Sequence, residues 1–336
     1  MKRNPYYSGP PSDHFDGLRF FNPDHPATDR SLGQLLRWRL FDRHARWDVP
    51  PPSPSIRPPA RRRALAVTLV GHASVLVQMD GMNLLVDPVW SQRASPLRWL
   101  GPRRWNAPAV ALEALPPVHA VLVTHNHYDH LDLATLARLQ QAHAPRVLAP
   151  LGNDAVIRRH LPGLQVDTLD WWQATAVGPL RVTLVPALHW SARGWGDRRM
   201  ALWGGFHLQG DASCYVAGDT AYGNGWPFRQ LRARLGAPDL AVLPIGAYAP
   251  RWFMRAQHMG ADEAVQAMLD CGAGHAVGVH WGTFRLTDEP RLEPPGLLVR
   301  TLRERGLDPA RFAALQAGET WEAAVHGHRQ GDPAIA

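Results

Sequence analysis

Four side chains that can bind metals fall within six residues of this sequence. The stretch THNHYDH places His125, His127, Asp129 and His130 directly after an apolar run at 118–123. A loop at the end of a strand can turn His125 and His127 toward one point while Asp129 and His130 reach a second point nearby. Imidazole and carboxylate groups are ligands of divalent transition metals. The spacing therefore predicts two adjacent metal ions rather than one.

Three more residues of the same types stand where later strands are expected to end. His189 follows the apolar run 180–188, Asp219 follows 214–218 and His280 follows 275–279. Two adjacent ions need about seven or eight ligands, so these residues and the cluster form a sufficient set. Such a pair of ions lowers the pKa of a bound water and stabilises negative charge on a phosphate, which suits phosphodiester hydrolysis. Any one of the residues can be purely structural, but together they predict one shared site.

The elements that must position these residues are short apolar runs separated by Gly, Pro and Asp. Runs rich in Val and Leu predict buried strands at 64–71, 73–80, 82–88, 118–125, 146–150, 180–189, 213–219, 240–246 and 275–282. Helical periodicity predicts helices at 131–143, 153–161, 226–235, 262–270 and 294–305. Strands that alternate with helices indicate a layered α/β protein, and two halves of similar strand content can pack as facing sheets.

Residues 1–60 form a Pro- and aromatic-rich extension that precedes the main domain at 61–326 and a short tail at 327–336. Ser31 and Gln34 fit a capping box. The residues that follow recur at helical spacing among arginines: Leu32, Leu35, Leu36, Leu40 and Phe41. We favour an apolar face that covers the core of the main domain, while a membrane-surface role is an alternative that is compatible with it.

The composition excludes several classes of protein. Hydrophobic residues make up 45% of the 336 residues, which is enough for a folded core. Only two cysteines occur, so neither a disulfide framework nor a thiolate zinc site is expected. No apolar run approaches the length of a membrane span, and the first twenty residues hold no signal-peptide core, so we expect a cytoplasmic protein. The net charge of +7 suits anionic lipid, anionic small substrates or nucleic acid.

Longer blocks of sequence carry a resemblance to a known family. The cluster HNHYDH with the three later ligands resembles the dinuclear site of the metallo-β-lactamase fold. The N-acylphosphatidylethanolamine-hydrolysing phospholipase D family is similar over longer blocks, which span about residues 15–325: FNP, VGHASVLVQMDGMNLLVDPVW, HWSAR, AGDTAY, PIGAYAPRWFMRAQHM and HWGTFRLTDEPRLEPP. The sequence departs from the family pattern at Ala221, where Gly is expected, and in the loop 194–199, which is expected near the site and leaves the substrate preference open.

The resemblance implies an αββα sandwich, with two facing mixed sheets flanked by helices, and two zinc ions. One ion would be held by His125, His127 and His189, the other by Asp129, His130 and His280, with Asp219 as the bridge. Because no cysteine belongs to this set, manganese or iron are alternatives to zinc.

Several other residues are candidates for contact with substrate. The resemblance places the pair Gln257 and His258 beside a substrate phosphate, so His258 is a candidate catalytic residue along with Asp129, which can orient the attacking group. Aromatic residues near the ligands can line an apolar groove or belong to the core: Trp190, Trp252 and Phe253. Among the remaining polar residues, we expect Asp87 to support a metal ligand and His72 and His207 to be structural.

The resulting hypothesis is a metal-dependent phosphodiesterase of phospholipase D type. It would cleave N-acylphosphatidylethanolamine or a related phospholipid to phosphatidic acid and N-acylethanolamine, and it would associate peripherally with anionic membranes. The alternatives are a lactonase, a generic phosphodiesterase or a nuclease of the same fold, and a non-catalytic protein that binds lipid or metal. Nucleic acid is the weaker partner because no dedicated RNA-binding insertion separates the ligands, and a homodimer remains an open alternative.

Overall fold

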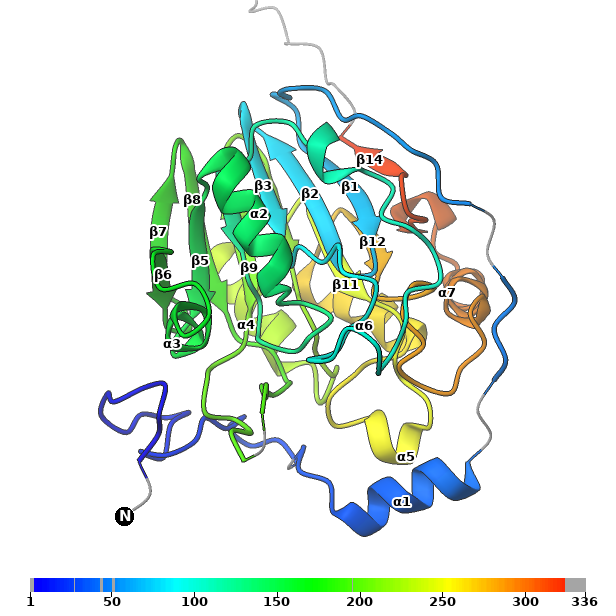
Figure 1. Ribbon diagram of the computed structural model, residues 1–336. Coiled ribbons are helices and arrows are strands. Elements are labelled where there is room, and N and C mark those ends of the chain that lie inside the picture. Colours follow the sequence, from blue (N-terminus) through cyan, green and yellow to red (C-terminus); the bar gives the residue numbers. More distant parts are fainter. Residues whose placement is uncertain (1–2, 27, 43–44, 50–51, 195, 324–336) are drawn as a thin grey trace, which may run out of the picture.

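Two seven-stranded sheets lie face to face between two layers of helices in the computed structural model (Figure 1). The structure describes residues 3–26, 28–42, 45–49, 52–194 and 196–323. Buried side chains from both sheets form the largest apolar cluster, which includes Val67 and Leu84 from one sheet and Leu184 and Val242 from the other. The α/β fold class and the facing sheets predicted from the sequence are therefore confirmed.

The first sheet has the strand order β14-β1-β2-β3-β4-β5-β6. Strands β1 to β3 are antiparallel neighbours, whereas β3 to β6 run parallel. The bounds are β1 Ala66–Gly71, β2 Ser74–Met79, β3 Met82–Val86, β4 Ala120–Leu122, β5 Arg146–Pro150, β6 Val166–Leu169 and β14 Thr320–Glu322. Strand β2 and most of its neighbours are buried along their whole length, which explains their Val- and Leu-rich sequences.

The second sheet has the order β13-β12-β11-β10-β9-β8-β7. Here β7 to β10 are antiparallel and β10 to β13 are parallel. The bounds are β7 Ala174–Val177, β8 Leu180–Val185, β9 Gly205–Gln209, β10 Ser213–Val216, β11 Leu240–Pro244, β12 His275–Val279 and β13 Phe312–Ala314. In both sheets the parallel strands deliver their carboxyl ends to one edge, which is where an α/β fold presents functional groups.

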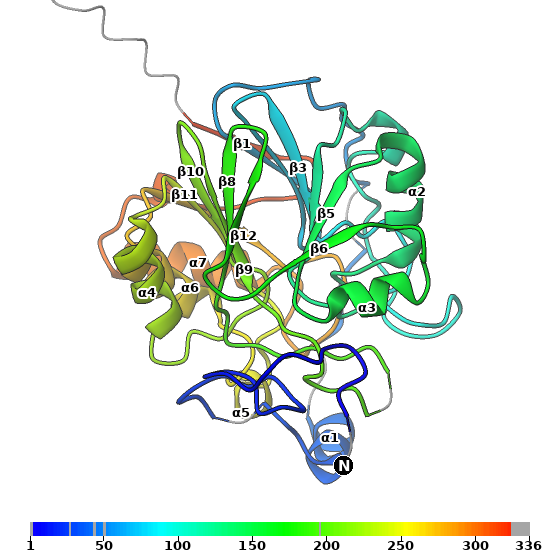
Figure 2. The ribbon, with the colours of Figure 1, turned by 90° about the vertical axis from the view of Figure 1, so that its left-hand side faces the viewer.

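Helices cover the outer face of each sheet (Figure 2). The first sheet is covered by α2 (Leu133–His143) and α3 (Asn153–Arg158), the second by α4 (Trp226–Leu235), α6 (Ala261–Cys271) and α7 (Glu293–Glu304). Asp132 caps α2 by accepting hydrogen bonds from the backbone N–H groups of Ala134 and Thr135. The remaining helices are α1 (Leu32–Phe41), the single turn α5 (Arg251–Met254) and the 3₁₀ turns at 112–114 and 309–311. None of the described helices has the length and apolar character that crossing a membrane requires.

The sequence predicted nine of the fourteen described strands and missed β6, β7, β9, β13 and β14. All five helices predicted in the main domain are present, and α4 has the predicted bounds. Strands β6 and β7 were missed because each has only four residues and their sequences are partly polar and half-exposed. Strand β9 begins at Gly205, where a Cβ would lie 2.6 Å from the carbonyl oxygen of Val216, so close packing of backbones requires the glycine that made this strand look like a loop.

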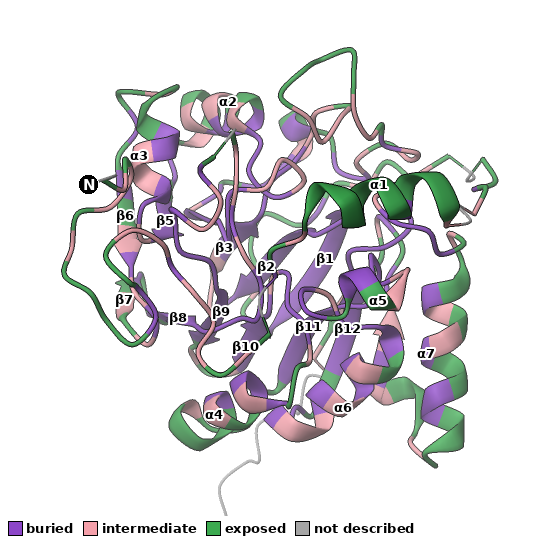
Figure 3. Cartoon of the chain, turned by 90° about the horizontal axis from the view of Figure 1, so that it is seen from below, coloured by how far each residue is buried: buried purple, intermediate pink, exposed green. Residues whose placement is uncertain are grey.

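Helix α1 forms where it was expected, but its apolar side chains do not cover the core. The capping box of Ser31 and Gln34 is present. Only Trp38 is buried, and Figure 3 shows the helix almost entirely in the colour of exposed residues. The exposed apolar side chains are Leu32, Leu35, Leu36, Leu40 and Phe41, with exposed fractions of 38–80%. The favoured expectation of a core-covering face is therefore wrong for these residues, because Trp38 alone turns toward the main domain.

The residues before α1 belong to the body of the molecule. Phe15 and Phe20 are buried in the cluster between the sheets. Asn22, from the FNP block, donates a side-chain hydrogen bond of 2.9 Å to the carbonyl oxygen of His189. The first part of the extension thus contacts the backbone of a predicted metal ligand. The predicted C-terminal tail at 327–336 lies outside the described residues.

Candidate metal centre

The predicted ligands meet where strands of both sheets end. The loop after β4 supplies His125, His127, Asp129 and His130, and the segments after β8, β10 and β12 supply His189, Asp219 and His280. Apart from His127 and Asp129, which are partly exposed, these side chains are buried. Residues separated by up to 155 positions therefore share one site, as the sequence analysis expected.

The first group of donors consists of three imidazoles. Nε2 of His125 lies 2.9 Å from Nδ1 of His127, and Nε2 of His189 lies 3.2 Å from the same atom. Three ring nitrogens that converge in this way can bind one cation. This is the set that the resemblance assigned to one ion.

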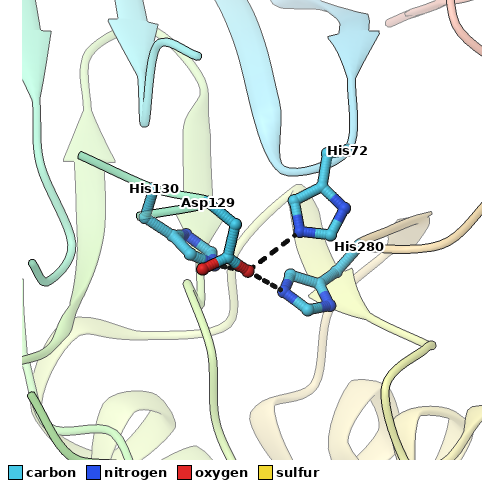
Figure 4. Close-up of side chains that lie close together, drawn as sticks. All are labelled: His72, Asp129, His130 and His280. Atoms are coloured by element: carbon cyan, nitrogen blue, oxygen red, sulfur yellow. Dashed lines mark hydrogen bonds and ion pairs between the residues drawn. The ribbon is translucent and has the colours of Figure 1, made fainter. Parts of the chain in front are cut away.

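The second group lies beside the first and combines a carboxylate with imidazoles (Figure 4). Oδ2 of Asp129 lies 3.3 Å from Nε2 of His280 and 3.5 Å from Nε2 of His130. The same group includes a histidine that the sequence analysis had assigned a structural role, His72, whose Nε2 lies 3.1 Å from the Asp129 carboxylate. No ligand spacing in the sequence marks this residue, because it comes from a turn far from the histidine cluster.

Asp219 connects the two groups. Its Oδ2 lies 3.2 Å from Nε2 of His130, 3.7 Å from Nε2 of His189 and 3.9 Å from Nε2 of His125. Its Oδ1 lies 3.1 Å from Nε2 of His280. A carboxylate in this position can contact both cations, which is the bridging role that the resemblance implied.

Two of the donor atoms are placed to bind metal ions rather than to form hydrogen bonds with neighbouring ligands. Oδ1 of Asp219 and Nε2 of His130 are buried and close to other polar atoms, yet neither has a hydrogen bond of acceptable geometry among the described residues. Buried polar atoms normally find a hydrogen-bond partner. Atoms that converge on a common point without bonding one another are typical of ligands around a cation, so the residues present suit two divalent ions.

The ionisation states also favour cations. Burial disfavours a charged imidazole and lowers the pKa of His127 and His189 to about 3, so both rings are neutral and offer lone pairs. Burial opposes ionisation of Asp219, but the neighbouring His130 and His280 outweigh it and hold the pKa of this carboxyl well below its usual value. Asp219 and these two rings are thus in the forms that bind metals. Burial also opposes protonation of His280 and His130, but Asp219 and Asp129 outweigh it, raising the pKa of His280 to about 9 and that of His130 well above its usual value, so both rings hold a proton that a bound cation would displace.

Hydrogen bonds outside the donor groups hold the ligands in place. Oδ2 of Asp87 lies 2.7 Å from Nδ1 of His130, and the same carboxylate accepts hydrogen bonds from the backbone N–H and hydroxyl of Thr124. Nδ1 of His189 lies 2.9 Å from the carbonyl oxygen of Gln257. Such contacts fix the ring orientation of metal-binding histidines. Asp87 has the supporting position expected from the sequence.

The candidate substrate residues divide into two sets. The partly exposed His258 lies at the centre, with its buried Nδ1 3.9 Å from Oδ2 of Asp219 and without a hydrogen-bond partner among the described residues. Trp190 packs edge-on against His127 with ring centroids 4.3 Å apart, and its indole N–H donates to the side chain of Gln257. The side chain of Gln257 is therefore bonded to Trp190, and its carbonyl oxygen contacts His189.

The other two aromatic candidates contact the N-terminal helix. Phe253 packs on Trp38 with ring centroids 4.8 Å apart. The half-exposed Trp252 donates to Asp42 and lies under the guanidinium of Arg37. The contacts of Phe253 agree with the core alternative rather than with a groove beside the metals, because α5 faces α1. The remaining candidate, His207, lies in β9, away from the donor groups, and is buried as expected.

Comparisons with known proteins agree with this geometry. A family profile described as "Beta-lactamase superfamily domain" matches residues 82–281. The chain belongs to this superfamily. Within the superfamily, it is 41% identical over 274 residues to an uncharacterized protein of Mycobacterium tuberculosis, covering 79% of this chain and 72% of that protein. It is 35% identical over 272 residues to a protein of Caenorhabditis elegans named N-acyl-phosphatidylethanolamine-hydrolyzing phospholipase D 1, covering 77% of this chain and 76% of the relative.

Solved structures of other proteins have the same fold. The isothiocyanate hydrolase from Delia radicum gut bacteria superposes with a TM-score of 0.60 at 22% identity, covering 77% of this chain and all of that one. More distant relatives in sequence are named metal-dependent hydrolases. With its metal-binding cluster, this member of the beta-lactamase superfamily is a metal-dependent hydrolase.

Proposed function

We propose that the protein is a phosphodiesterase of phospholipase D type that cleaves N-acylphosphatidylethanolamine or a closely related phospholipid. The observation that carries this proposal is the pair of donor groups joined by Asp219, in a chain related to a worm protein with that name. The reaction adds one water across the phosphodiester. The phosphorus–oxygen bond to the headgroup breaks, phosphatidic acid keeps the phosphate, and the leaving oxygen takes a proton to give N-acylethanolamine.

The two ions, with zinc as the proposed identity, would lower the pKa of a water and offset negative charge on the phosphate. Asp129 belongs to the donor groups and is partly exposed, so it can also orient the attacking water. His258 is partly exposed beside Asp219, its Nδ1 has no hydrogen-bond partner in the part of the chain that the structure describes, and its ring can hydrogen-bond a phosphate oxygen or the headgroup oxygen. Trp190, fixed by Gln257, offers an apolar surface next to His127.

We further propose that the protein reaches its lipid on an anionic membrane surface through α1. This helix exposes Leu36 and Leu40, with 59% and 70% of their surfaces accessible, next to Arg37 and Arg39. Apolar side chains with flanking arginines suit the interface of an anionic bilayer. Figure 1 shows α1 and α5 at the same end of the molecule, and the chain leads from α5 directly to His258.

The activity is tested with the zinc-loaded protein and N-acylphosphatidylethanolamine in mixed micelles, with separate measurement of phosphatidic acid and N-acylethanolamine. Metal-dependent release of both products supports the proposal, and Asp129→Asn provides the blank. Hydrolysis of a lactone, a generic phosphodiester or RNA by a protein that leaves the lipid intact would assign a different substrate to the same site. Two bound metals without any hydrolysis would favour a binding protein.

The membrane contact is tested by co-sedimentation with vesicles of phosphatidylglycerol and phosphatidylcholine. We expect binding to the anionic vesicles that weakens with salt and with the double substitution Leu36→Glu and Leu40→Glu. Leu292→Glu is the matched control, because Leu292 is 60% exposed but lies beside α7. Binding that is insensitive to salt and to the α1 substitutions would contradict this part of the proposal.

A further inference from the structure

His72 belongs to the metal centre although it comes from a hairpin that supplies no predicted ligand. It occupies the turn between β1 and β2. Its side chain is buried and points at Asp129, as Figure 4 shows, with Nε2 3.1 Å from the carboxylate oxygen Oδ2. Its ring also packs against His280 with centroids 4.1 Å apart. The hairpin of the first sheet thus contacts a ligand from the loop after β4 and a ligand from the second sheet.

The backbone of His72 has a conformation that a histidine rarely adopts. Its φ of 55° lies in the left-handed region, where glycine or asparagine is the usual residue. Such a strained conformation persists only where the surroundings fix it, and such residues cluster at functional sites. Two bonds fix it here: the backbone N–H donates to the hydroxyl of Thr283, and the carbonyl oxygen accepts from the backbone N–H of His280. A tight turn alone does not require an imidazole at this position.

The donor set indicates what the imidazole does. The second group already has Asp129, His130 and His280, with Asp219 shared between the groups. Catalytic zinc sites usually have three protein ligands and keep a position open for water, and this group already supplies three besides the shared Asp219. A fifth protein ligand would close that position, whereas a hydrogen bond to Asp129 would leave it open.

We propose that His72 is a positioning residue that donates a hydrogen bond from Nε2–H to Oδ2 of Asp129 and holds His280 through its own carbonyl oxygen. A hydrogen bond to an ionised carboxylate is among the stronger kinds in proteins. The β1–β2 hairpin thereby sets the orientation of two ligands of the second ion. This inference rests on the metal site of the proposed function but not on its substrate.

Cobalt(II) binding to the full chain tests the proposal without any substrate. The protein is stripped with a chelator and titrated with cobalt(II), and the two binding steps are followed by absorption and electron paramagnetic resonance. We expect His72→Ala to weaken the second step about 10–100-fold, the range for residues that support a metal ligand, while the first step is unchanged. His72→Gln, whose amide can donate to the same oxygen, restores part of the affinity.

Two further variants separate positioning from folding. His72→Asn accepts the left-handed backbone but is too short to reach Asp129, so we expect a stable fold with the weakened second step. His207→Asn, at a buried histidine of β9, should leave both steps unchanged.

Unchanged stepwise affinities in His72→Ala, or a wild-type chain that binds a single ion, would overturn the proposal. X-ray absorption spectra of the cobalt-loaded protein would also overturn the proposal if they showed one imidazole ligand fewer in His72→Gln than in wild type, because His72 would then be a metal ligand. If the wild-type protein hydrolysed no phospholipid while the cobalt results were as expected, the proposed substrate would be refuted and the role of His72 would stand.

Discussion

The metal centre and helix α1 were both anticipated from a few residues, but the molecule holds them in very different ways. Each ligand of the centre is packed among other ligands, and several have a second partner: His130 contacts Asp87, and His189 contacts the Gln257 carbonyl. Helix α1 turns a single buried side chain, Trp38, toward the main domain and exposes its leucines.

The difference shows which sequence patterns determine their surroundings. A buried polar cluster is stable only if every member finds partners, so the motif implies the geometry around it. Helical spacing of leucines requires a helix, but it does not determine what the apolar face contacts. The predictions below test this contrast, starting with the ligand that should matter most.

Asp219→Ala should have the largest effect, because it removes the carboxylate that both donor groups share. We expect loss of bound metal and a decrease in hydrolysis of about 10³-fold, which corresponds to about 4 kcal/mol of lost stabilisation. Metal content by mass spectrometry and the rate of hydrolysis measure it. Asp211→Ala, at the exposed turn before the same strand β10, is the control and should retain both metals. A variant at position 219 that keeps two tightly bound ions would contradict the shared role.

Asp87→Asn should have the next largest effect, because its carboxylate holds His130 without belonging to the ligand set. The amide keeps the shape of the side chain but loses the charge that Nδ1 of His130 and the hydroxyl of Thr124 contact. We expect metal affinity to decrease about 10–100-fold. Competition with a chelator measures the affinity. The control is Asp80→Asn, at the turn between β2 and β3, and an equal loss there would show that the effect is not specific.

Sequence reasoning identified some residues of the site and missed others. His125, His127 and the other predicted ligands were found because four of them lie within six residues and the others follow apolar runs that predict strands, whose ends meet at one edge of an α/β fold. His72 was not assigned to the site, because its position depends on a pairing between the β1–β2 hairpin and the segment after β12 that no local pattern encodes. The contacts of Trp252 with Arg37 and Asp42 were missed for the same reason. No local sequence pattern determines where α1 packs on the main domain.

Trp38→Ala tests how helix α1 is attached to the main domain. Trp38 packs with Phe253 and Met254 in a small cluster of their own, and its indole N–H donates to Asp288. A buried tryptophan in a core costs about 3–5 kcal/mol when truncated. Because this cluster is separate from the main core, we expect α1 to open locally while the unfolding of the main domain changes little. Hydrogen exchange of the α1 amides should rise in Trp38→Ala and remain as in wild type in Leu36→Ala. Equal protection in both variants would show that α1 is held by more than Trp38.

The smallest predicted effect concerns His14, which attaches the start of the chain to the turn before β7. Nε2 of His14 lies 2.8 Å from Asp170, Nδ1 lies 2.6 Å from Asp13, and the ring stacks on Trp171. Burial disfavours the charged ring, but the two carboxylates outweigh it and raise the pKa of His14 above its usual value. A raised pKa in the folded protein means that the charged ring stabilises the fold. That contribution is fully present below about pH 6.5, the usual pKa of histidine, and is lost as the pH rises through the raised pKa.

His14→Gln should therefore lower the free energy of unfolding at pH 6 by about 0.5–1 kcal/mol, the upper range for pairs with an exposed partner, and by less at pH 9. Urea unfolding of the metal-loaded protein at both pH values measures the difference, and His160→Gln, at a surface histidine after α3, corrects for general effects of losing an imidazole. A deficit that grows toward pH 9 would reverse the predicted sign. A deficit that shrinks as predicted would show that the charged ring of His14, paired with two carboxylates, helps to attach the start of the chain, with fewer contacts than hold the metal centre.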